Sequence, residues 1–145
     1  MTTAGPAEGQ RTAADRLGIT AGMVVSEVGR DDDCDTSLVE AIVERTGVEP
    51  ITEDTDDVVD VVLLWFREED GDLVDALMDA RTRLDNNGAI WVLTPKAGRD
   101  GHVEPSDIID AAPTAGLTQT STVPASKDWA ATKLVVPKGQ RAPRR

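Results

Sequence analysis

The sequence contains few of the residue types from which catalytic and metal sites are commonly built. It has one cysteine, one histidine and no tyrosine among 145 residues, with one phenylalanine and three tryptophans. A lone cysteine excludes an internal disulfide, and one cysteine with one histidine excludes a zinc site made mainly of those ligands. The core must therefore be packed largely from Val, Leu, Ile and Ala, and we assign no metal site and no catalytic residue.

Long apolar runs are also missing. The longest, Val61–Phe66, is far shorter than the roughly 20 residues of a membrane span. Residues 1–16 hold no apolar stretch of the roughly 7 to 15 residues that a secretory signal needs. A chain without disulfide, signal or span is expected in the cytoplasm and away from membranes.

Positive charge is scarce outside the last residues. The chain has 27 acidic and 15 basic residues and a net charge of −12, and four of the basic residues fall within residues 138–145. The acidic remainder would repel polyanions and shows no basic stripe, so a nucleic-acid partner is not expected. We interpret residues 138–145 as a basic, disordered tail.

What is present fits one α/β domain. A length of 145 residues matches a single domain. We place this domain at residues 17–137, after a leader at residues 1–16 that is either flexible or forms one helical turn. A short apolar run between glycines predicts a first strand at residues 23–28.

The next pattern is helical. Apolar residues recur at helical spacing from Leu38, after the capping-box spacing of Ser37 and Glu40, and the pattern closes at Gly47. A brief edge strand is expected at residues 48–52.

The most apolar segment, Val58–Phe66, is rich in β-branched residues and reads as a strand covered on both faces, at the centre of the sheet. An amphipathic helix follows at residues 73–84, stopped by a turn at residues 85–88. Residues 89–93 form another buried strand. This βαβ order predicts parallel strands.

The end of the chain predicts a different pairing. A short helix at residues 106–112 precedes two strands at residues 117–123 and 130–136. Their separation suits an antiparallel hairpin and is too short for a crossover. The fold class is therefore α/β, a mostly parallel Rossmann-like sheet flanked by helices, with a C-terminal antiparallel hairpin.

This succession of strand 58–66, helix, strand 89–95, helix and hairpin resembles the second half of the class I S-adenosylmethionine-dependent methyltransferase fold, over roughly residues 20–137. The resemblance implies that the last strand enters between its two predecessors. The whole chain also resembles a family of short actinobacterial proteins known as a domain of unknown function, chiefly at residues 22–29, 58–66 and 127–138. That second resemblance implies no activity.

The methyltransferase signature is only partly present. Glu27, Val28 and Gly29 match its beginning, but Asp31 and Asp33 stand where further glycines let the cofactor approach the backbone. Their side chains would occupy the cofactor's space and oppose its anionic groups, so no cofactor is expected. Glu53 or Asp54 lies about where the family places its ribose-binding acid.

The acidic run at residues 31–35 has two readings, a divalent cation site or a complement to the positive end of the helix near Leu38. Cys34 lies within this run, and flanking Asp33 and Asp35 disfavour the reactive thiolate.

A rare group of donors, Lys96, Arg99 and His102, follows the strand at residues 89–93, at the edge of the sheet where α/β folds bind ligands. We interpret His102 as a water-exposed loop residue. Lys127 and Trp129 lie at the hairpin corner, and Trp129 either contacts a partner or closes the core. If the hairpin packs beside strand 89–93, these residues form one surface suited to an acidic partner.

These features lead to two functional hypotheses. The first is a non-catalytic adaptor or regulatory module that binds another protein on a degenerate methyltransferase-like fold. The alternative is a small-molecule module for a nucleotide-like ligand, or a divergent methyltransferase, that uses the cleft between Gly29, Glu53 and the Lys96 loop.

Overall fold

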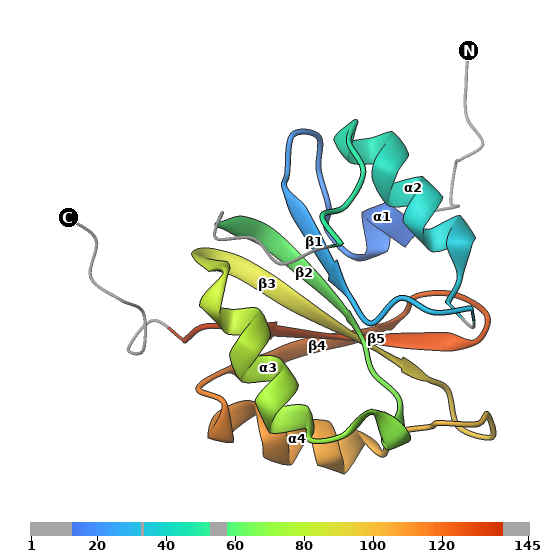
Figure 1. Ribbon diagram of the computed structural model, residues 1–145, viewed down its shortest axis with the longest axis vertical. Coiled ribbons are helices and arrows are strands. Elements are labelled where there is room, and N and C mark those ends of the chain that lie inside the picture. The colour runs from blue at the N-terminus through green and yellow to red at the C-terminus, as the bar shows by residue number, and fades with distance from the viewer. Residues whose placement is uncertain (1–12, 33, 53–57, 138–145) are drawn as a thin grey trace.

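The structure is a computed structural model that describes residues 13–32, 34–52 and 58–137. Its centre is a five-stranded sheet in the order β1-β2-β3-β5-β4 (Figure 1). The strands are β1 (Val25–Val28), β2 (Val59–Trp65), β3 (Leu84–Pro95), β4 (Thr118–Pro124) and β5 (Trp129–Val135). The helices are α1 (Ala13–Arg16), α2 (Thr36–Thr46), α3 (Leu73–Thr82) and α4 (Pro105–Thr114), with a 3-10 turn at Glu68–Asp70.

The strand pairings confirm the expected fold class. Strands β1, β2 and β3 are parallel, whereas β5 is antiparallel to both of its neighbours, β3 and β4. The last strand therefore lies between its two predecessors, as the resemblance implied. The middle strand of the sheet is β3, however, and not β2 as predicted.

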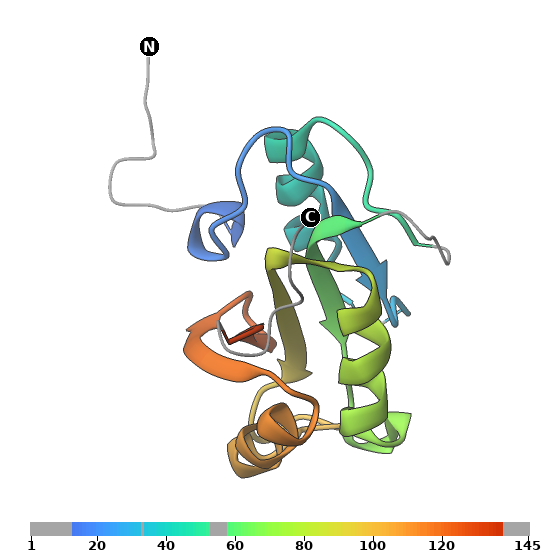
Figure 2. The same cartoon turned by 90° about the vertical axis from the view of Figure 1, so that its left-hand side faces the viewer.

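Helices cover both faces of the sheet. Figures 1 and 2 show α1 and α2 on one face and α3 and α4 on the other. Successive side chains of a strand point to opposite faces, so β2 sends Val62 and Leu64 toward α3 and α4, and Leu63 and Trp65 toward α1 and α2. All three tryptophans belong to the layer beneath α1 and α2.

The start of β3 differs from the prediction. Residues 85–88, expected as a turn, lie within β3, where they form an irregularity between the Val59–Leu84 and Val61–Ala89 pairs. A side chain at Gly88 would collide with the carbonyl oxygen of Asp60, so the bulge places the chain against its neighbour.

Helix α2 ends as predicted but starts with a different cap. Asp35 is the N-cap, and its side chain accepts hydrogen bonds from the backbone N–H groups of Ser37 and Leu38. The predicted capping box of Ser37 and Glu40 is therefore wrong by two residues. Gly47 closes the helix in the left-handed conformation, which glycine adopts without steric cost.

Two short segments contact α2 and the edge strand β1. Ala13–Arg16 form a helical turn, the second of the two alternatives for the leader, and Asp15 pairs with Arg45 of α2. The folded region therefore begins before residue 17. Of the expected strand at residues 48–52, only Ile51 makes a bridge, to Ser26 of β1. Among the described residues, no helix combines the length and apolar character needed to cross a membrane.

Candidate functional site

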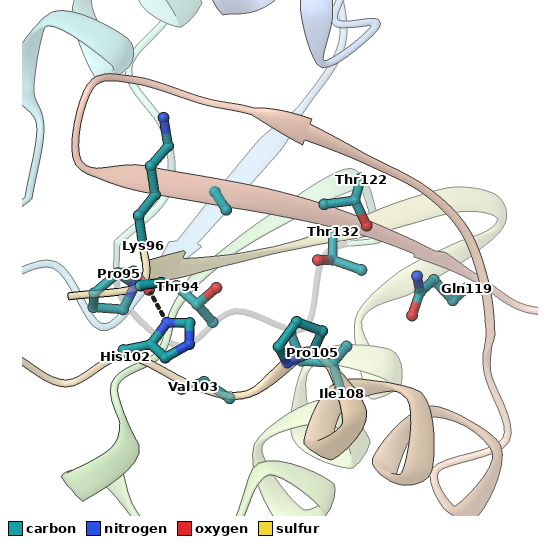
Figure 3. A pocket seen from close by; sticks show the side chains of 12 residues that line it. Thr94, Pro95, Lys96, His102, Val103, Pro105, Ile108, Gln119, Thr122 and Thr132 are labelled. Carbon is teal, nitrogen blue, oxygen red and sulfur yellow. Dashed lines mark hydrogen bonds between the residues drawn. The ribbon is translucent and has the colours of Figure 1, made fainter. Parts of the chain in front are cut away.

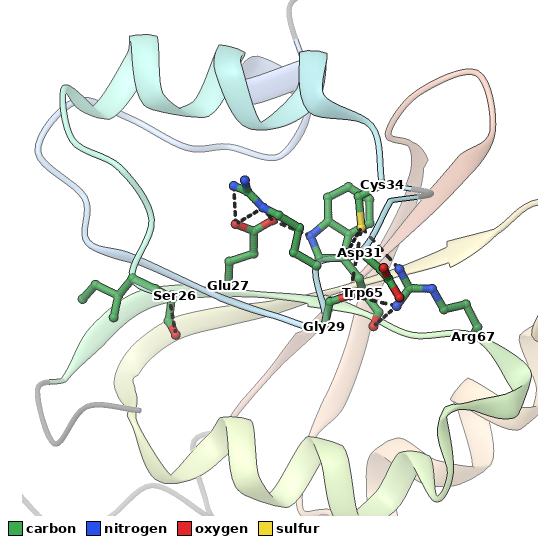
Figure 4. Close-up of polar contacts among 9 residues, drawn as sticks. Ser26, Glu27, Gly29, Asp31, Cys34, Trp65 and Arg67 are labelled. Atoms are coloured by element: carbon green, nitrogen blue, oxygen red, sulfur yellow. Dashed lines mark hydrogen bonds and ion pairs between the residues drawn. The ribbon is translucent and has the colours of Figure 1, made fainter. Parts of the chain in front are cut away.

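The carboxyl ends of β1 and β2 lie side by side, at the edge where α/β folds usually bind their ligands. Arg67, just after β2, is only 7% exposed. Its Nη1 donates to the carbonyl oxygens of Gly29, at 2.8 Å, and Trp65, at 3.2 Å (Figure 4). The guanidinium thus joins the ends of both strands and occupies the edge with a side chain of the protein itself.

Further contacts hold Arg67 in this position. Its Nη1 lies 3.2 Å from Oδ2 of Asp70, its Nη2 lies 3.3 Å from Sγ of Cys34, and its guanidinium lies over the ring of Trp129. A buried charge with such an enclosing set of partners is costly to disturb. Arg67 was not predicted as a site residue, because three acidic residues follow it, a pattern typical of a solvated turn.

Glu27, predicted to bind a ligand, is buried and engaged with its own chain. Its Oε1 lies 2.7 Å from Nη2 of Arg30, and its Oε2 accepts a hydrogen bond of 2.7 Å from the indole Nε1 of Trp65. The hydrogen bond to Glu27 raises the pKa of Arg30. Both carboxylate oxygens therefore have internal partners.

Gly29 is also explained by internal packing. Its φ is +85°, and a Cβ atom there would collide with the carbonyl oxygen of Trp65. The glycine lets β1 approach β2 closely, a need that exists without any cofactor.

A cleft of about 270 Å³ remains beside these residues, lined by Glu27, Val28, Gly29, Thr52, Ala76, Asp79, Ala80 and Arg83. Glu53 and Asp54, the predicted ribose acids, lie outside the described residues, as does Asp33.

The contacts of the acidic run favour the reading in which it stabilises the start of α2 over the reading of a cation site. Asp35 caps α2, and Oδ1 of Asp31 accepts the backbone N–H of Asp32. Within the parts of the chain that the structure describes, no three Cys, His, Asp or Glu side chains are grouped to hold a metal ion. Cys34, expected among acids alone, lies against the Arg67 guanidinium because the loop folds back over the end of β2.

The loop after β3 and the hairpin corner, which were predicted to form one surface, lie next to each other. The backbone N–H of Lys96 donates to the carbonyl oxygen of Asp128 at 2.9 Å, and Arg99 pairs with the Asp128 carboxylate at 3.2 Å. The loop after β3 and the hairpin corner with Lys127 are therefore adjacent, as the predicted topology required. A cavity of about 400 Å³ lies there, lined by Pro95, Gly98, Arg99, Asp100 and Trp129.

Trp129 takes the second of its two predicted roles, whereas His102 differs from its prediction. Trp129 is 3% exposed and packs edge-to-face on Trp65, with 4.8 Å between ring centroids, so it closes the core and is not an exposed anchor. His102, expected in water, is half-buried, with its Nδ1 2.9 Å from the carbonyl oxygen of Pro95. The turn at residues 98–101 folds the histidine back onto β3.

Residues 14–138 match the family model described as "Protein of unknown function (DUF3052)". The chain belongs to this family. It is 51% identical over 131 residues to the uncharacterized protein Rv2239c of Mycobacterium tuberculosis, a match that covers 90% of this chain and 82% of the relative. The family resemblance drawn from the sequence is thereby confirmed.

Solved structures with the same fold are S-adenosylmethionine-dependent methyltransferases. The mitomycin 7-O-methyltransferase MmcR matches 86% of this chain with a TM-score of 0.63 and 12% identity. The O-methyltransferase NcsB1, solved with S-adenosylmethionine and 2-hydroxy-5-methyl naphthoic acid, matches 88% with a TM-score of 0.60 and 14% identity. The chain spans about half the length of each, 53% and 51%. Similarity at this identity shows the fold alone.

Proposed function

We propose that this protein is a non-catalytic adaptor or regulatory module that binds another protein on a methyltransferase-like fold. The observation that carries the proposal is the Arg67 guanidinium, which joins the carboxyl ends of β1 and β2 through Gly29 and Trp65. S-adenosylmethionine, bound where methyltransferases of this fold bind it, would need access to this edge. To admit it, the protein would have to move a buried cation away from its hydrogen-bond partners.

The surface offered to the partner is the cationic corner, which we define as Lys96, Arg99 and Lys127. Arg99 is paired with Asp128, so Lys96 and Lys127 supply the charge available to a partner. Positive groups are scarce on a chain with a net charge of −12. An acidic segment of another protein is the chemistry that such a corner recognises, and the association should weaken as salt is raised.

The alternative, a nucleotide-like ligand in the 270 Å³ cleft, has weaker support. The Glu27 carboxylate already has two partners, and in the rest of the lining the negative charge of Asp79 offsets the positive charge of Arg83, so no net positive charge attracts phosphates. A divergent methyltransferase would also need its cofactor to reach the strand ends that the Arg67 guanidinium occupies.

Affinity capture from the native cell tests the adaptor proposal. The bait variant Lys96→Glu/Lys127→Glu should lose the partners of the wild type while keeping its melting temperature. A matched control, Arg144→Glu/Arg145→Glu, makes the same change in net charge within the tail and should keep them. Recovery of the same partners by the Lys96→Glu/Lys127→Glu bait would contradict the proposal.

A further inference from the structure

A separate cavity of about 150 Å³ lies between the sheet and the start of α4 (Figure 3). The carboxyl end of β3 and the hairpin strands β4 and β5 form one wall, and residues 102–108 form the other. Its lining is Thr94, Pro95, Lys96, Ala97, His102, Val103, Pro105, Ile108, Gln119, Thr122, Ala130 and Thr132.

Two buried threonines line this cavity. Thr94 and Thr132 are each 4% exposed, and neither side-chain hydroxyl makes a hydrogen bond to any residue that the structure describes. The register sets Thr132 opposite Thr122 of β4, and Figure 3 shows the hydroxyl-bearing side chains of Thr94, Thr122 and Thr132 gathered on one side of the cavity. The hydroxyl oxygens are not among the buried unsatisfied atoms of the described residues, so they are accessible from the cavity, and a molecule there can hydrogen-bond to both.

The charge around the cavity is unusual for this chain. The protein has 27 acidic residues, yet none lines this cavity, whereas cavities around α2, Gly29 and Arg99 each have an acidic side chain in their lining. No carboxylate therefore stands in the lining itself, and the nearest acidic residues along the chain are Glu104 and Asp107, at the start of α4.

The N-terminal end of a helix faces the same space. Helix α4 begins at the cavity with Pro105, and its N-cap, Glu104, makes no side-chain hydrogen bond to the helix end. The N-terminus of a helix carries partial positive charge that attracts anions. His102 lies beside it, while Figure 3 shows the Lys96 ammonium group pointing away from the threonines.

We propose that this cavity binds a small monocarboxylate with a short aliphatic chain. The carboxylate accepts hydrogen bonds from the hydroxyls of Thr94 and Thr132 near the start of α4, and the alkyl chain packs against Val103 and Ile108. A cavity of 150 Å³ is the size that holds benzene, which limits the ligand to about six non-hydrogen atoms. This inference goes beyond the adaptor proposal, and either can fail without the other.

The test is a titration with butyrate, which has this size, followed by amide chemical shifts in NMR at constant ionic strength. Butyramide and butylammonium are the matched neutral and cationic probes. We expect butyrate to shift the amides of Thr94, Thr132 and Ile108 with a dissociation constant of about 1 mM or lower. The two control probes should bind at least about tenfold more weakly, a difference that one lost charge-assisted contact produces.

Three variants distinguish a loss of butyrate binding from a loss of folding. Thr94→Val/Thr132→Val removes the unbonded hydroxyls with little change in shape, so the melting temperature should hold or rise while butyrate binding falls at least about tenfold. Thr118→Val, on the exposed strand β4 and outside the cavity, is the control and should bind as wild type. Ala130→Leu, which fills the cavity from β5, should abolish binding while both hydroxyls remain.

Three outcomes would overturn the proposal. The first is no shift with butyrate, which would leave a cavity holding water only. The second is equal binding of butyrate and butyramide. The third is full binding by both Thr94→Val/Thr132→Val and Ala130→Leu.

Discussion

The guanidinium carbon of Arg67 lies 5.3 Å from the ring centroid of Trp129. This cation–π contact joins the segment after β2 to the first residue of the last strand, and the same guanidinium bonds the carbonyl oxygens at the ends of β1 and β2. Arg67 therefore connects the edge that the methyltransferase fold normally keeps for a ligand with the hairpin that completes the sheet.

Replacing Arg67 with lysine should destabilise the protein although the positive charge is kept. A lysine ammonium lacks the planar fork that reaches Gly29, Trp65 and Cys34 at once. We expect the free energy of unfolding, measured by urea denaturation, to fall by about 3 kcal/mol. Arg99→Lys, at a half-exposed ion pair, is the control and should change it by less than about 1 kcal/mol. Equal effects of the two variants would show that Arg67 has no special structural role.

Truncating Trp129 tests its assignment to the core. Trp129→Ala removes a side chain that is 3% exposed and packs edge-to-face on Trp65. The free energy of unfolding should fall by about 3 to 5 kcal/mol. An unchanged melting temperature would instead restore Trp129 as an exposed contact residue.

Two glycines with nearly equal positive φ angles give a matched comparison. Gly29 and Gly47 have φ angles of +85° and +88°, but a Cβ atom meets the Trp65 carbonyl oxygen at Gly29 and open space at Gly47. Gly47→Ala should cost about 1 to 2 kcal/mol, the strain of the left-handed region. Gly29→Ala should cost more, on the order of 3 kcal/mol or above, because the strands must also separate. Thermal denaturation of both variants measures these losses of stability, and equal losses would contradict the close approach of β1 to β2.

The position of β2 in the core can be tested with one substitution at two sites. Val62 is 0% exposed, and Val58, just before the strand, is 62% exposed. Val62→Asp buries an unpaired carboxylate, which costs several kcal/mol against a total stability of about 5 to 15 kcal/mol, so the variant should not fold. Val58→Asp should melt within a few degrees of wild type, as monitored by circular dichroism. A cooperative, wild-type melt of Val62→Asp would contradict the assigned core.

Strong local patterns explain why most of the fold was predictable. The segment around Val62 is apolar on both sides and has no reading other than a buried strand, and Gly47 stops α2 through a backbone conformation that other residues resist. Residues 85–88 misled the prediction because a polar cluster with glycine is typical of a turn. Here the glycine serves a bulge against Asp60.

The site was less predictable, because it depends on contacts between residues distant in the sequence. The signature residues Glu27 and Gly29 were found, but their roles are set by Trp65, 38 residues after Glu27. Arg67 carries no local signal that separates it from a solvated arginine. The hydroxyls of Thr94 and Thr132 were not predicted either, since threonine is an ordinary strand residue, and they stand out only because they make no hydrogen bond to the described part of the chain.

Calorimetric titration with S-adenosylmethionine tests the central claim, that this methyltransferase-like fold is closed to S-adenosylmethionine. The O-methyltransferase NcsB1, solved with that compound, serves as the positive control. With Arg67 bonded to Gly29 and Trp65, and with Asp31 in place of a glycine, we expect no measurable binding heat from the protein. A micromolar dissociation constant, about −8 kcal/mol of binding free energy, would contradict the account.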